Sequence, residues 1–550
     1  MSDHSNTADF VFTGGTILTM DEAHPTAEAV AVRDGMIVRV GRADYVNELT
    51  GPATQVRDLG TSTLLPGFID PHSHFINSLA MSEQVNISPP PVGPCSTAEE
   101  IVAELRRAAD ERGLAPGELF IGYGYDENQL PSDHPLTKDD LDPAFPDNPV
   151  LVMHVSLHGA VLNSAAMKKY DVSDATETPE GGIIVRRPGT QEPLGLVMEM
   201  AFLPIFANLP VPTLEQELEQ VKAGQMIYAA AGVTTAQEGA THAPQVAVLQ
   251  RAAQAGALFI DVVAYPFITD MEPVLADNPP ETFGKYNNGL KLGGIKITMD
   301  GSPQGRTAYF TTPYLTGGPS GEQDWCGEPS FPQEFFNEAL KKCYDLGLQV
   351  TFHANGDAAI DMILEGHAYA AADDPSADRR STVIHSQFVR PDQLRKYVEY
   401  NLVPSLYTEH TFYFADAHIA NRGIEQASYI SPMRDAIDLG LRPTNHTDFN
   451  VVPIDQLFVV WSAVNRTRRD GEVIGADQRV TPHEALRAIT IDAAHQYFEE
   501  DRKGSITTGK LADFVILDAD PTSVAPHAIR DITVIETIKA GTTIYRKADA

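Results

Sequence analysis

Hydrophobic and polar residues follow one pattern at the two ends of the chain and another in the middle. Near the start, AEAVAVRDGMIVRVG alternates apolar and polar residues around Asp34-Gly35, a strong signal for a β-hairpin turn. Near the end, ITVIETIKAGTTIYR does the same around Ala540-Gly541. Since chain ends commonly lie close together, we expect residues 1–62 and 504–550 to form one small β-sandwich domain.

The middle of the chain alternates short apolar runs with helical patterns. Eight runs are predicted to be strands: TLLPGFID (63–70), GVTTAQEGA (232–240), LFIDVVAYPF (258–267), LGGIKITMDG (292–301), LQVTFHANGD (348–357), STVIHSQFV (381–389), LVPSLYTEH (402–410) and RPTNHTDF (442–449). Between them, one helical pattern starts at Thr213 and Gln216, which suit a capping box, and another ends at Gly347. Eight strand–helix units predict an α/β fold, a (β/α)8 TIM-type barrel over residues 63–503.

Residues 71–231 separate the first two predicted strands, which is too long a connection for a single helix. This segment has its own strand-like runs, LFIGYGYD and VLVMHVSLHG, and a helical pattern, STAEEIVAELRRAAD. We expect residues 80–212 to form an α+β subdomain inserted after the first barrel strand. Such an insertion near the mouth of the active site would contribute to the substrate pocket.

Composition excludes several classes of partner. The 550 residues include 40 Lys and Arg against 75 Asp and Glu, and this net negative charge repels phosphate backbones and anionic lipids. No run approaches the ~20 apolar residues of a membrane span, and the N-terminus has no secretory signal. The three cysteines, without CxxC spacing, fit a reducing compartment. We expect a cytoplasmic protein that binds a small molecule, without nucleic acid or membrane partners; assembly into a homo-oligomer is left open.

The stretch PGFIDPHSHF raises the question of a metal site. Residues two apart in a strand point to the same face, so His72 and His74 present both imidazoles together. Imidazole is a versatile neutral ligand for divalent transition metals. Taken alone, the pair is equally consistent with two polar residues that end a strand.

Four other predicted strands carry a suitable group near their C-terminal ends, where barrel enzymes place their chemistry. These groups are Lys296, His353, His385 and Asp448. Each histidine by itself could be an ordinary buried one, and Asp448 could cap a turn. Lys296 interrupts an apolar strand, which is costly unless the amine is paired or functional. Five strands that all carry such a group at their C-terminal ends are improbable by chance, so together these groups predict a metal site.

Together these motifs resemble the amidohydrolase superfamily, specifically its YtcJ-like branch (amidohydrolase family 3), which includes N-substituted formamide deformylases. The resemblance rests on PGFIDPHSHF (66–75), IKITMDGSPQGRTA (295–308), HANGDAAIDMIL (353–364), IHSQ (384–387), HTDF (446–449) and GSITTGKLADFVILDADP (504–521). It extends over nearly the whole chain, including the split β-domain and the insertion.

The resemblance implies a site for two divalent metal ions, usually zinc, although the mixed ligand set also suits manganese or iron. Carried onto this chain, His72, His74 and Asp448 would bind the more buried ion. His353 and His385 would bind the other, and Lys296, carboxylated by CO₂, would bridge both. A carbamate needs a neutral amine, and two adjacent dications would stabilise its negative charge.

The implied activity is metal-dependent hydrolysis of a carbon–nitrogen bond other than a peptide bond, in an N-acyl or N-formyl amide. A metal-bound hydroxide would attack the carbonyl, and Asp448 would pass the proton to the leaving nitrogen. Lys296 argues against a one-metal deaminase, which lacks a bridging lysine. Two alternatives stay open: hydrolysis of a carbamate, ester or cyclic amide, and a non-catalytic metal-binding regulatory protein.

Six further residues are expected to contact substrate: Arg306, His158, Asn163, Tyr125, His446 and Glu238. Arg306 follows the Lys296 strand and could bind a carboxylate or orient a carbonyl, but loop arginines are commonly solvated. Asn163 could equally form an ordinary buried hydrogen bond. His446 replaces the small residue usual in the family, and should touch either the substrate or the groups behind the metal ligands.

Overall fold

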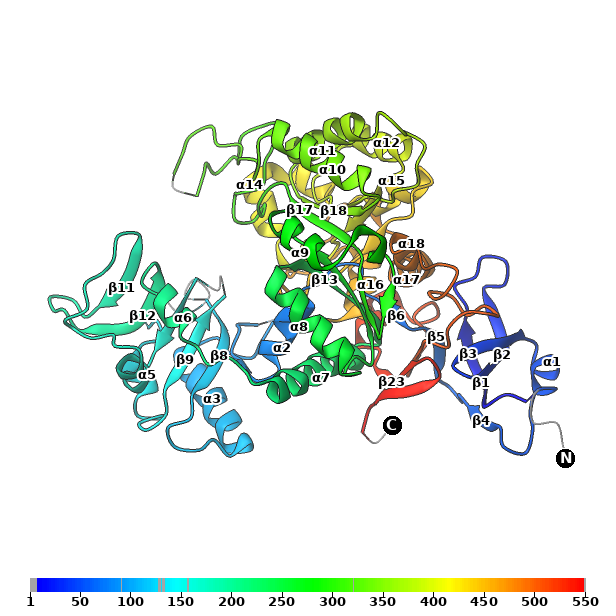
Figure 1. Cartoon of the computed structure of the whole chain (residues 1–550), viewed down its shortest axis with the longest axis horizontal. Coiled ribbons are helices and arrows are strands. Elements are labelled where there is room, and N and C mark those ends of the chain that lie inside the picture. The colour runs from blue at the N-terminus through cyan, green and yellow to red at the C-terminus, as the bar shows by residue number, and fades with distance from the viewer. Residues whose placement is uncertain are drawn as a thin grey trace. The chain divides into compact units, whose positions relative to one another are not determined.

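The computed structural model describes residues 7–90, 92–126, 130, 134–155, 158–319 and 321–548. The chain divides into two compact units (Figure 1). One unit comprises Met1–Ile76 and Gln225–Ala550, and the other comprises Asn77–Gly224. Residues 1–6 and 549–550 of the predicted terminal domain lie outside the described residues.

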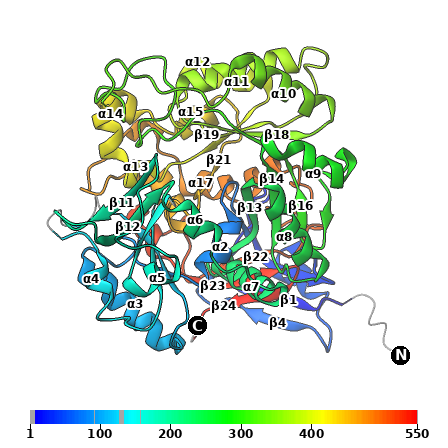
Figure 2. The same cartoon turned by 60° about the vertical axis from the view of Figure 1, so that its left-hand side comes forward.

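Strands from both ends of the chain lie in one sheet of the first unit. They are β1 (Phe10–Leu18), β2 (Thr26–Arg33), β3 (Met36–Gly41), β4 (Gln55–Asp58), β5 (Thr63–Pro66), β22 (Phe514–Leu517), β23 (Val534–Lys539) and β24 (Thr542–Arg546). The order is β24-β23-β22-β5-β1-β2-β3, with β4 paired to β1. Both predicted hairpins are confirmed, since positive φ angles at Asp34-Gly35 and Ala540-Gly541 turn the chain between paired strands. Figure 2 shows the red C-terminal strands beside the blue N-terminal ones.

Each of the eight runs predicted as strands in the middle region contains a strand. These are β6 (Phe68–Ile69), β13 (Val233–Thr241), β14 (Asp261–Pro266), β17 (Gly294–Thr298), β18 (Gln349–Ala354), β19 (Thr382–His385), β20 (Val403–Leu406) and β21 (Thr444–Asn445). They form two parallel sheets, β6-β13-β14 and β17-β18-β19-β20-β21; the short strands β16 (Leu290–Leu292) and β15 (Tyr286–Asn287) extend the first sheet beyond β14. Almost all of their residues are buried, as is usual for parallel strands covered on both faces.

The first predicted strand, 63–70, is divided between two sheets. β5 pairs with β22 of the terminal sheet, whereas β6 pairs with β13. Between the two strands, Gly67 lets β13 approach closely, because a Cβ atom at this position would lie 2.4 Å from the Thr234 side chain. The terminal sheet therefore extends past the predicted boundary at residue 62.

The two parallel sheets contact each other at both edges. On one side, Phe267 after β14 pairs in parallel with Lys296 of β17. On the other side, the Asp448 amide donates to the His72 carbonyl at 3.1 Å, and the His74 amide donates to the Phe449 carbonyl at 2.6 Å. The segments that follow β6 and β21 are thus held side by side.

Helices lie between the strands of the first unit. They are α1 (Ala43–Asn47), α8 (Ala243–Gln254), α9 (Met271–Asp277), α10 (Gln333–Asp345), α11 (Asp357–Ala370), α12 (Pro391–Tyr400), α13 (His410–Tyr413), α14 (Ala415–Ser428), α15 (Met433–Asp438), α16 (Gln456–Asn465), α17 (Pro482–Ala488) and α18 (Ile491–Gln496), while α2 (Phe75–Met81) and α7 (Leu214–Ala230) include residues of both units. Among the described residues, no helix is long and apolar enough to cross a membrane.

The predicted helix signals are confirmed at α7 and α10. Thr213 and Gln216 exchange side-chain and backbone hydrogen bonds of 2.9 and 3.3 Å, which is the predicted capping box. α10 is followed by Gly347 with a φ of 69°, the left-handed conformation that ends many helices.

The second unit is built around a six-stranded sheet with the order β11-β12-β10-β9-β8-β7. Its elements are β7 (Val85–Asn86), α3 (Ala98–Arg112), β8 (Phe120–Tyr125), α4 (Lys138–Leu141), β9 (Val150–His154), β10 (Gly159–Leu162), α5 (Ser164–Lys169), β11 (Gly182–Arg186), β12 (Pro193–Glu199) and α6 (Leu203–Ala207). Val150 and Val152 of β9 pack in a core with α3, whereas Leu151 and Met153 pack with α5 and α6. The period of two along the strand thus separates the two cores. The insertion predicted over residues 80–212 lies within this unit, Asn77–Gly224.

Candidate metal centre

The six predicted metal ligands lie at the carboxyl ends of parallel strands in the first unit. His72 and His74 follow β6, Lys296 lies in β17, His353 in β18, His385 ends β19, and Asp448 follows β21. Parallel strands end at the same edge of a sheet, so residues far apart in sequence meet there. The backbone at His385 and Asp448 has positive φ angles of 71° and 53°. Such angles are uncommon outside glycine and often occur at functional sites.

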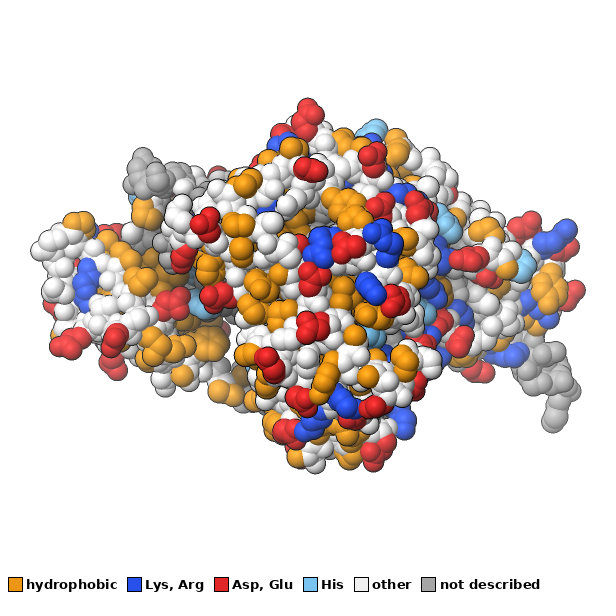
Figure 3. Space-filling view, turned by 90° about the horizontal axis from the view of Figure 1, so that it is seen from above, with side chains coloured by type: hydrophobic (Ala, Val, Ile, Leu, Met, Phe, Trp, Pro, Cys, Tyr) orange, Lys and Arg blue, Asp and Glu red, His pale blue; other side chains and the backbone are white. Residues whose placement is uncertain are grey.

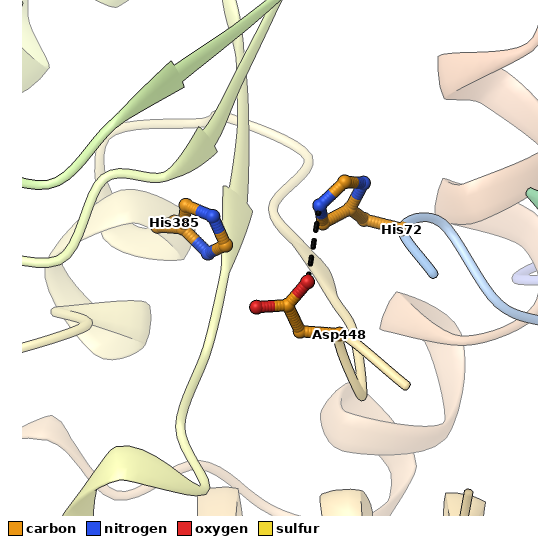
Figure 4. A group of neighbouring side chains, drawn as sticks. All are labelled: His72, His385 and Asp448. Carbon is orange, nitrogen blue, oxygen red and sulfur yellow. Dashed lines mark ion pairs between the residues drawn. The ribbon is translucent and has the colours of Figure 1, made fainter. Parts of the chain in front are cut away.

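Three of these side chains converge closely. One ligand atom from each of His72, His385 and Asp448 lies within 4.8 Å of the others, and all three residues are buried. Figure 4 shows the two rings and the carboxylate approaching one another from separate segments. The Nε2 atoms of His72 and His74 lie 3.3 and 3.2 Å from the same Asp448 oxygen, Oδ1. A single carboxylate oxygen therefore faces both histidines of the HxH pair.

His353 joins the cluster through His385. The Nδ1 atom of His353 lies 3.0 Å from the Nε2 atom of His385, and the ring centroids are 4.5 Å apart. His385 also lies against His72, with 5.4 Å between centroids. All four predicted histidine ligands therefore belong to one continuous group.

The fold changes the chemistry of Lys296. Its side chain is buried, and its Nζ atom has no hydrogen-bond partner among the described residues. Burial lowers the pKa of Lys296 to about 7, although the carboxylates of Asp448 and Glu238 oppose the shift. A partly neutral, unpartnered amine fits the carbamate that the resemblance implies at this position.

Gln237 of β13, which sequence reasoning missed, fixes the proton position on His72. The Gln237 Nε2 donates to the Pro71 carbonyl at 2.7 Å, so its Oε1, 2.6 Å from His72 Nδ1, must accept the proton of that nitrogen. Burial lowers the pKa of His72 to about 4, so the ring is neutral and its Nε2 carries a lone pair. That lone pair points at an Asp448 oxygen 3.3 Å away. The His72 nitrogen and the Asp448 oxygen are both acceptors and face each other, an arrangement that fits a cation bound to both.

Comparison with known proteins assigns the family. A profile of the amidohydrolase family matches residues 55–545, which is most of the chain. The chain belongs to the amidohydrolase family. The putative amidohydrolase YtcJ of Bacillus subtilis is 27% identical to it over 98% of this chain and 99% of that protein. An N-substituted formamide deformylase of Arthrobacter pascens is 24% identical over 98% of each chain.

Solved structures contain the same fold. An uncharacterized metal-dependent hydrolase from Pyrococcus furiosus superposes with a TM-score of 0.73 over 94% of this amidohydrolase and 100% of that chain, at 23% identity. The family profile and the curated relatives confirm the family resemblance read from the motifs.

His446 of the amidohydrolase lies between His385 and Ser405. The side chain is fully buried, with Nε2 3.1 Å from His385 Nδ1 and Nδ1 3.0 Å from Ser405 Oγ. These contacts place His446 directly behind His385, a predicted metal ligand. A contact of His446 with substrate stays a prediction.

Glu238 is near the centre but faces backbone. Its carboxylate accepts hydrogen bonds from the Ile76 amide at 2.6 Å and the Ala240 amide at 3.1 Å, and only 2% of the residue is exposed. Burial raises the pKa of Glu238, while the nearby His74 and Lys296 lower it. Glu238 thus holds the chain that follows the HxH pair; a contact of Glu238 with substrate stays a prediction.

Arg306 lies in the loop after β17, half-buried, with a backbone φ of 61°. Its carbonyl accepts a hydrogen bond of 2.7 Å from the Trp325 indole. The same loop reaches the centre at Gly301, whose carbonyl lies 3.4 Å from His353 Nε2. A substrate contact of Arg306 stays a prediction.

The other three predicted substrate contacts belong to the second unit. Asn163 uses its whole amide within that unit, because it accepts from the Val150 and Ala166 amides and donates to the Phe145 and Asn148 carbonyls. This is a structural role at the start of α5. Tyr125 is buried beside His154, whereas His158 is exposed and lies 3.1 Å from Glu199. The substrate contacts of these residues stay predictions.

Two buried carboxylates support the centre and were not predicted. Asp70 accepts a hydrogen bond of 2.6 Å from Thr447 and thus links β6 to the segment before Asp448. Asp300 accepts three backbone hydrogen bonds, from Tyr309, Asn355 and Gly356, and thus joins the ends of β17 and β18. Burial raises the pKa of each acid to about 7. The sequence signal that could have indicated them is an acidic residue directly after an apolar strand: Asp70 in FID and Asp300 in ITMD.

Proposed function

We propose that this amidohydrolase is a metal-dependent enzyme that hydrolyses an amide-type C–N bond, in an N-acyl or N-formyl amide of a small molecule. The observation that carries the proposal is the buried Lys296 Nζ, which has no hydrogen-bond partner among the described residues and interacts electrostatically with His72 and Asp448. An isolated buried amine is unfavourable in a protein built only for stability. The similarity to an N-substituted formamide deformylase supports this substrate class.

We also infer that the eight strands β6, β13, β14 and β17 to β21 form one closed (β/α)8 barrel. The sequential order of the two parallel sheets supports this, as do the contacts at both of their edges. The strands of the two chain ends would then form the small β-sandwich beside the barrel. In the same arrangement, the second unit would be an insertion in the chain between the first two barrel strands, β6 and β13.

The donor set fits two divalent cations. His72, His74 and Asp448 would hold one ion, and His353 and His385 the other, with Lys296 bridging them as a carbamate. When bound, such ions polarise a carbonyl group and can lower the pKa of a bound water to about 7. Zinc is the favoured ion, because imidazole nitrogen and carboxylate oxygen are common zinc ligands.

The residues of the chain supply orientation and proton transfer. Gln237 holds His72 with Nε2 toward the centre, and the HxH spacing aims His74 at the same carboxylate. Asp448 faces both histidines and is the acidic residue among the six predicted ligands. As general base, Asp448 would take a proton from the attacking water, and as general acid it would return that proton to the leaving nitrogen.

The test combines metal analysis with a screen of N-formyl and N-acyl amides. We expect the purified protein to contain zinc or a similar ion, to hydrolyse some of these amides, and to lose activity after chelation and regain it with metal. Asp448→Asn should lower turnover by about 100-fold or more, since general acid–base catalysis contributes about 10²–10⁴-fold. The exposed Asp277→Asn is the control and should have wild-type turnover.

The other outcomes decide between the alternatives. Near wild-type turnover of Asp448→Asn would refute the proton-transfer role. Activity on carbamates, esters or cyclic amides alone would assign one of those substrate classes in place of amides, and the proposed metal centre would stand. Bound metal without activity on any acyl substrate would favour a metal-binding regulatory protein.

A further inference from the structure

The fully buried imidazole of His446 links a metal-ligand histidine to a serine hydroxyl. Its Nε2 atom lies 3.1 Å from His385 Nδ1, and its Nδ1 atom lies 3.0 Å from Ser405 Oγ. The three residues come from neighbouring strands: β19 pairs with β20, and the His446 amide donates to the Leu406 carbonyl at the end of β20. The strands thus place the side chains in a continuous row.

The row can carry its protons in two directions, because each imidazole nitrogen can donate or accept and a hydroxyl can do both. In one direction, His385 Nδ1 donates to His446, which donates to Ser405. This leaves a lone pair on His385 Nε2, the atom 3.0 Å from His353 Nδ1. In the other direction, Ser405 donates to His446, which donates to His385, and His385 Nε2 carries a proton. Only the first direction makes His385 Nε2 a metal ligand.

We propose that His446 is a positioning residue that accepts the Nδ1 proton of His385 and so fixes His385 in the tautomer that presents Nε2 to a metal ion shared with His353. This inference rests on the proposed metal-dependent function. Groups behind a ligand histidine commonly set its tautomer and the affinity of the metal site. His446 would do for His385 what Gln237 does for His72.

Packing restricts His446 to this role. The Tyr407 ring lies 4.9 Å from the His446 ring and the His72 ring lies 5.2 Å away, so neighbouring rings limit its rotation. Ser405 and His446 are both fully buried, which excludes bulk water as an alternative partner for either nitrogen. The hydroxyl of Ser405 therefore ends the row.

A second buried imidazole provides a matched control. His418 is fully buried, like His446, and its Nε2 atom lies 2.9 Å from the Nδ1 atom of another histidine, His410. His410 is not among the predicted metal ligands. Replacing His418 removes a buried imidazole and an imidazole–imidazole hydrogen bond without changing a ligand.

The experiment titrates the metal-free, full-length chain with Zn²⁺ in competition with a chromophoric chelator, and with Co²⁺ followed by its visible spectrum. We expect His446→Phe to weaken binding of one of two ions by about 10–100-fold and to alter the Co²⁺ spectrum. His418→Phe should bind both ions as the wild type does. His446→Gln keeps an acceptor atom at similar reach and should restore most of the affinity.

Wild-type affinity in His446→Phe, or an equal loss in His418→Phe, would overturn the inference. If His446→Phe does not fold, Ser405→Ala gives the answer, because it removes only the last acceptor of the row. That variant should bind one ion several-fold more weakly, and unchanged binding would again count against the inference. A wild-type chain that takes up neither ion would instead overturn the proposed function itself.

Discussion

Burial changes what the amine of Lys296 can do. In water a lysine is charged and hydrated, whereas Lys296 is buried without a hydrogen-bond partner among the described residues. The buried Lys291 provides the contrast, because its Nζ atom pairs with Glu499 and donates to the Tyr497 carbonyl at 3.0 Å. The same residue type is therefore paired at one buried position and unpartnered at the other.

This contrast predicts opposite effects of the same substitution. Lys296→Met should raise the free energy of unfolding of the metal-free protein by about 1–3 kcal/mol, because it removes an unsatisfied buried polar group and keeps an unbranched shape. Metal uptake should fall at the same time. Lys291→Met should lower the free energy of unfolding by about 1–3 kcal/mol, since the buried Glu499 then loses one of its two lysine partners and keeps only Lys503.

Urea unfolding of metal-free protein and elemental analysis check this pair of variants. Destabilisation by Lys296→Met would show that the wild-type amine has a stabilising partner. Full metal uptake by Lys296→Met would show that Lys296 is not a metal ligand.

At the scale of elements, one buried arginine connects several loops of the first unit. α16 ends at Arg466, whose backbone is left-handed with a φ of 48°. The Arg466 guanidinium is fully buried and donates to carbonyls of Ser431, Ile430 and Ile474, at 3.1, 2.8 and 3.0 Å. Ser431 in turn donates through its hydroxyl to the Tyr407 carbonyl at 3.0 Å, directly after β20. One arginine thus connects the end of α16, through Ser431, to the segment that follows β20.

Arg466→Met should therefore destabilise the first unit strongly. We expect a loss of about 3–5 kcal/mol, because several buried carbonyls lose their donor at once. Arg395→Met is the control: this arginine is exposed on α12, and surface substitutions usually change stability by less than about 0.5 kcal/mol. Chemical denaturation measures both. A loss below 1 kcal/mol for Arg466→Met would mean that water or another side chain replaces the guanidinium.

At the scale of the molecule, charge is organised differently inside and outside. The chain has 75 acidic and 40 basic residues, and acidic side chains are spread over the visible face, interspersed with basic ones (Figure 3). Inside, a cluster of opposite charges joins β14 to the terminal sheet. Lys539 pairs with Asp261 at 2.7 Å and with Asp513 at 2.8 Å, and Lys503 pairs with Asp261 and with Glu499. The first unit is thus connected by buried ion pairs.

This cluster predicts a loss of stability in acid. Burial alone would raise the pKa of Asp261, but Lys503 and Lys539 outweigh it and hold the pKa well below its usual range. A depressed pKa in the folded state stabilises the protein above the unfolded pKa of about 4, and this contribution is lost as pH falls through that region. The free energy of unfolding should therefore decrease from about pH 5 downward.

Denaturation at several pH values tests the assignment. Asp261→Asn should lower the free energy of unfolding at pH 7 by about 3–5 kcal/mol and make the acid dependence less steep. Asp277→Asn, at an exposed carboxylate, should change neither quantity. Wild-type acid dependence in Asp261→Asn would assign the loss to other groups, such as Glu500, whose pKa is about 2 because His495 and Arg380 outweigh its burial.

The sequence by itself determined the local elements and the ligand types. Period-two alternation and turn residues predict the terminal hairpins, and a Thr–Gln spacing predicts the start of α7, because these signals act over a few residues. The HxH spacing places His72 and His74 on one face, since strand geometry is local too. The motifs also identified the family, which the profile over residues 55–545 confirms.

Only the tertiary structure decided which side chains meet. His72 and Gln237 are separated by 165 residues and His385 and His446 by 61, so no local pattern predicts either contact. The same limit explains why the sequence left two roles open for His446, whose partners His385 and Ser405 come from other strands. Side-chain direction follows from the strand, but burial and hydrogen-bond partners depend on what the rest of the chain brings alongside. The tautomers and the charge state of Lys296, on which the proposed chemistry depends, follow from those contacts.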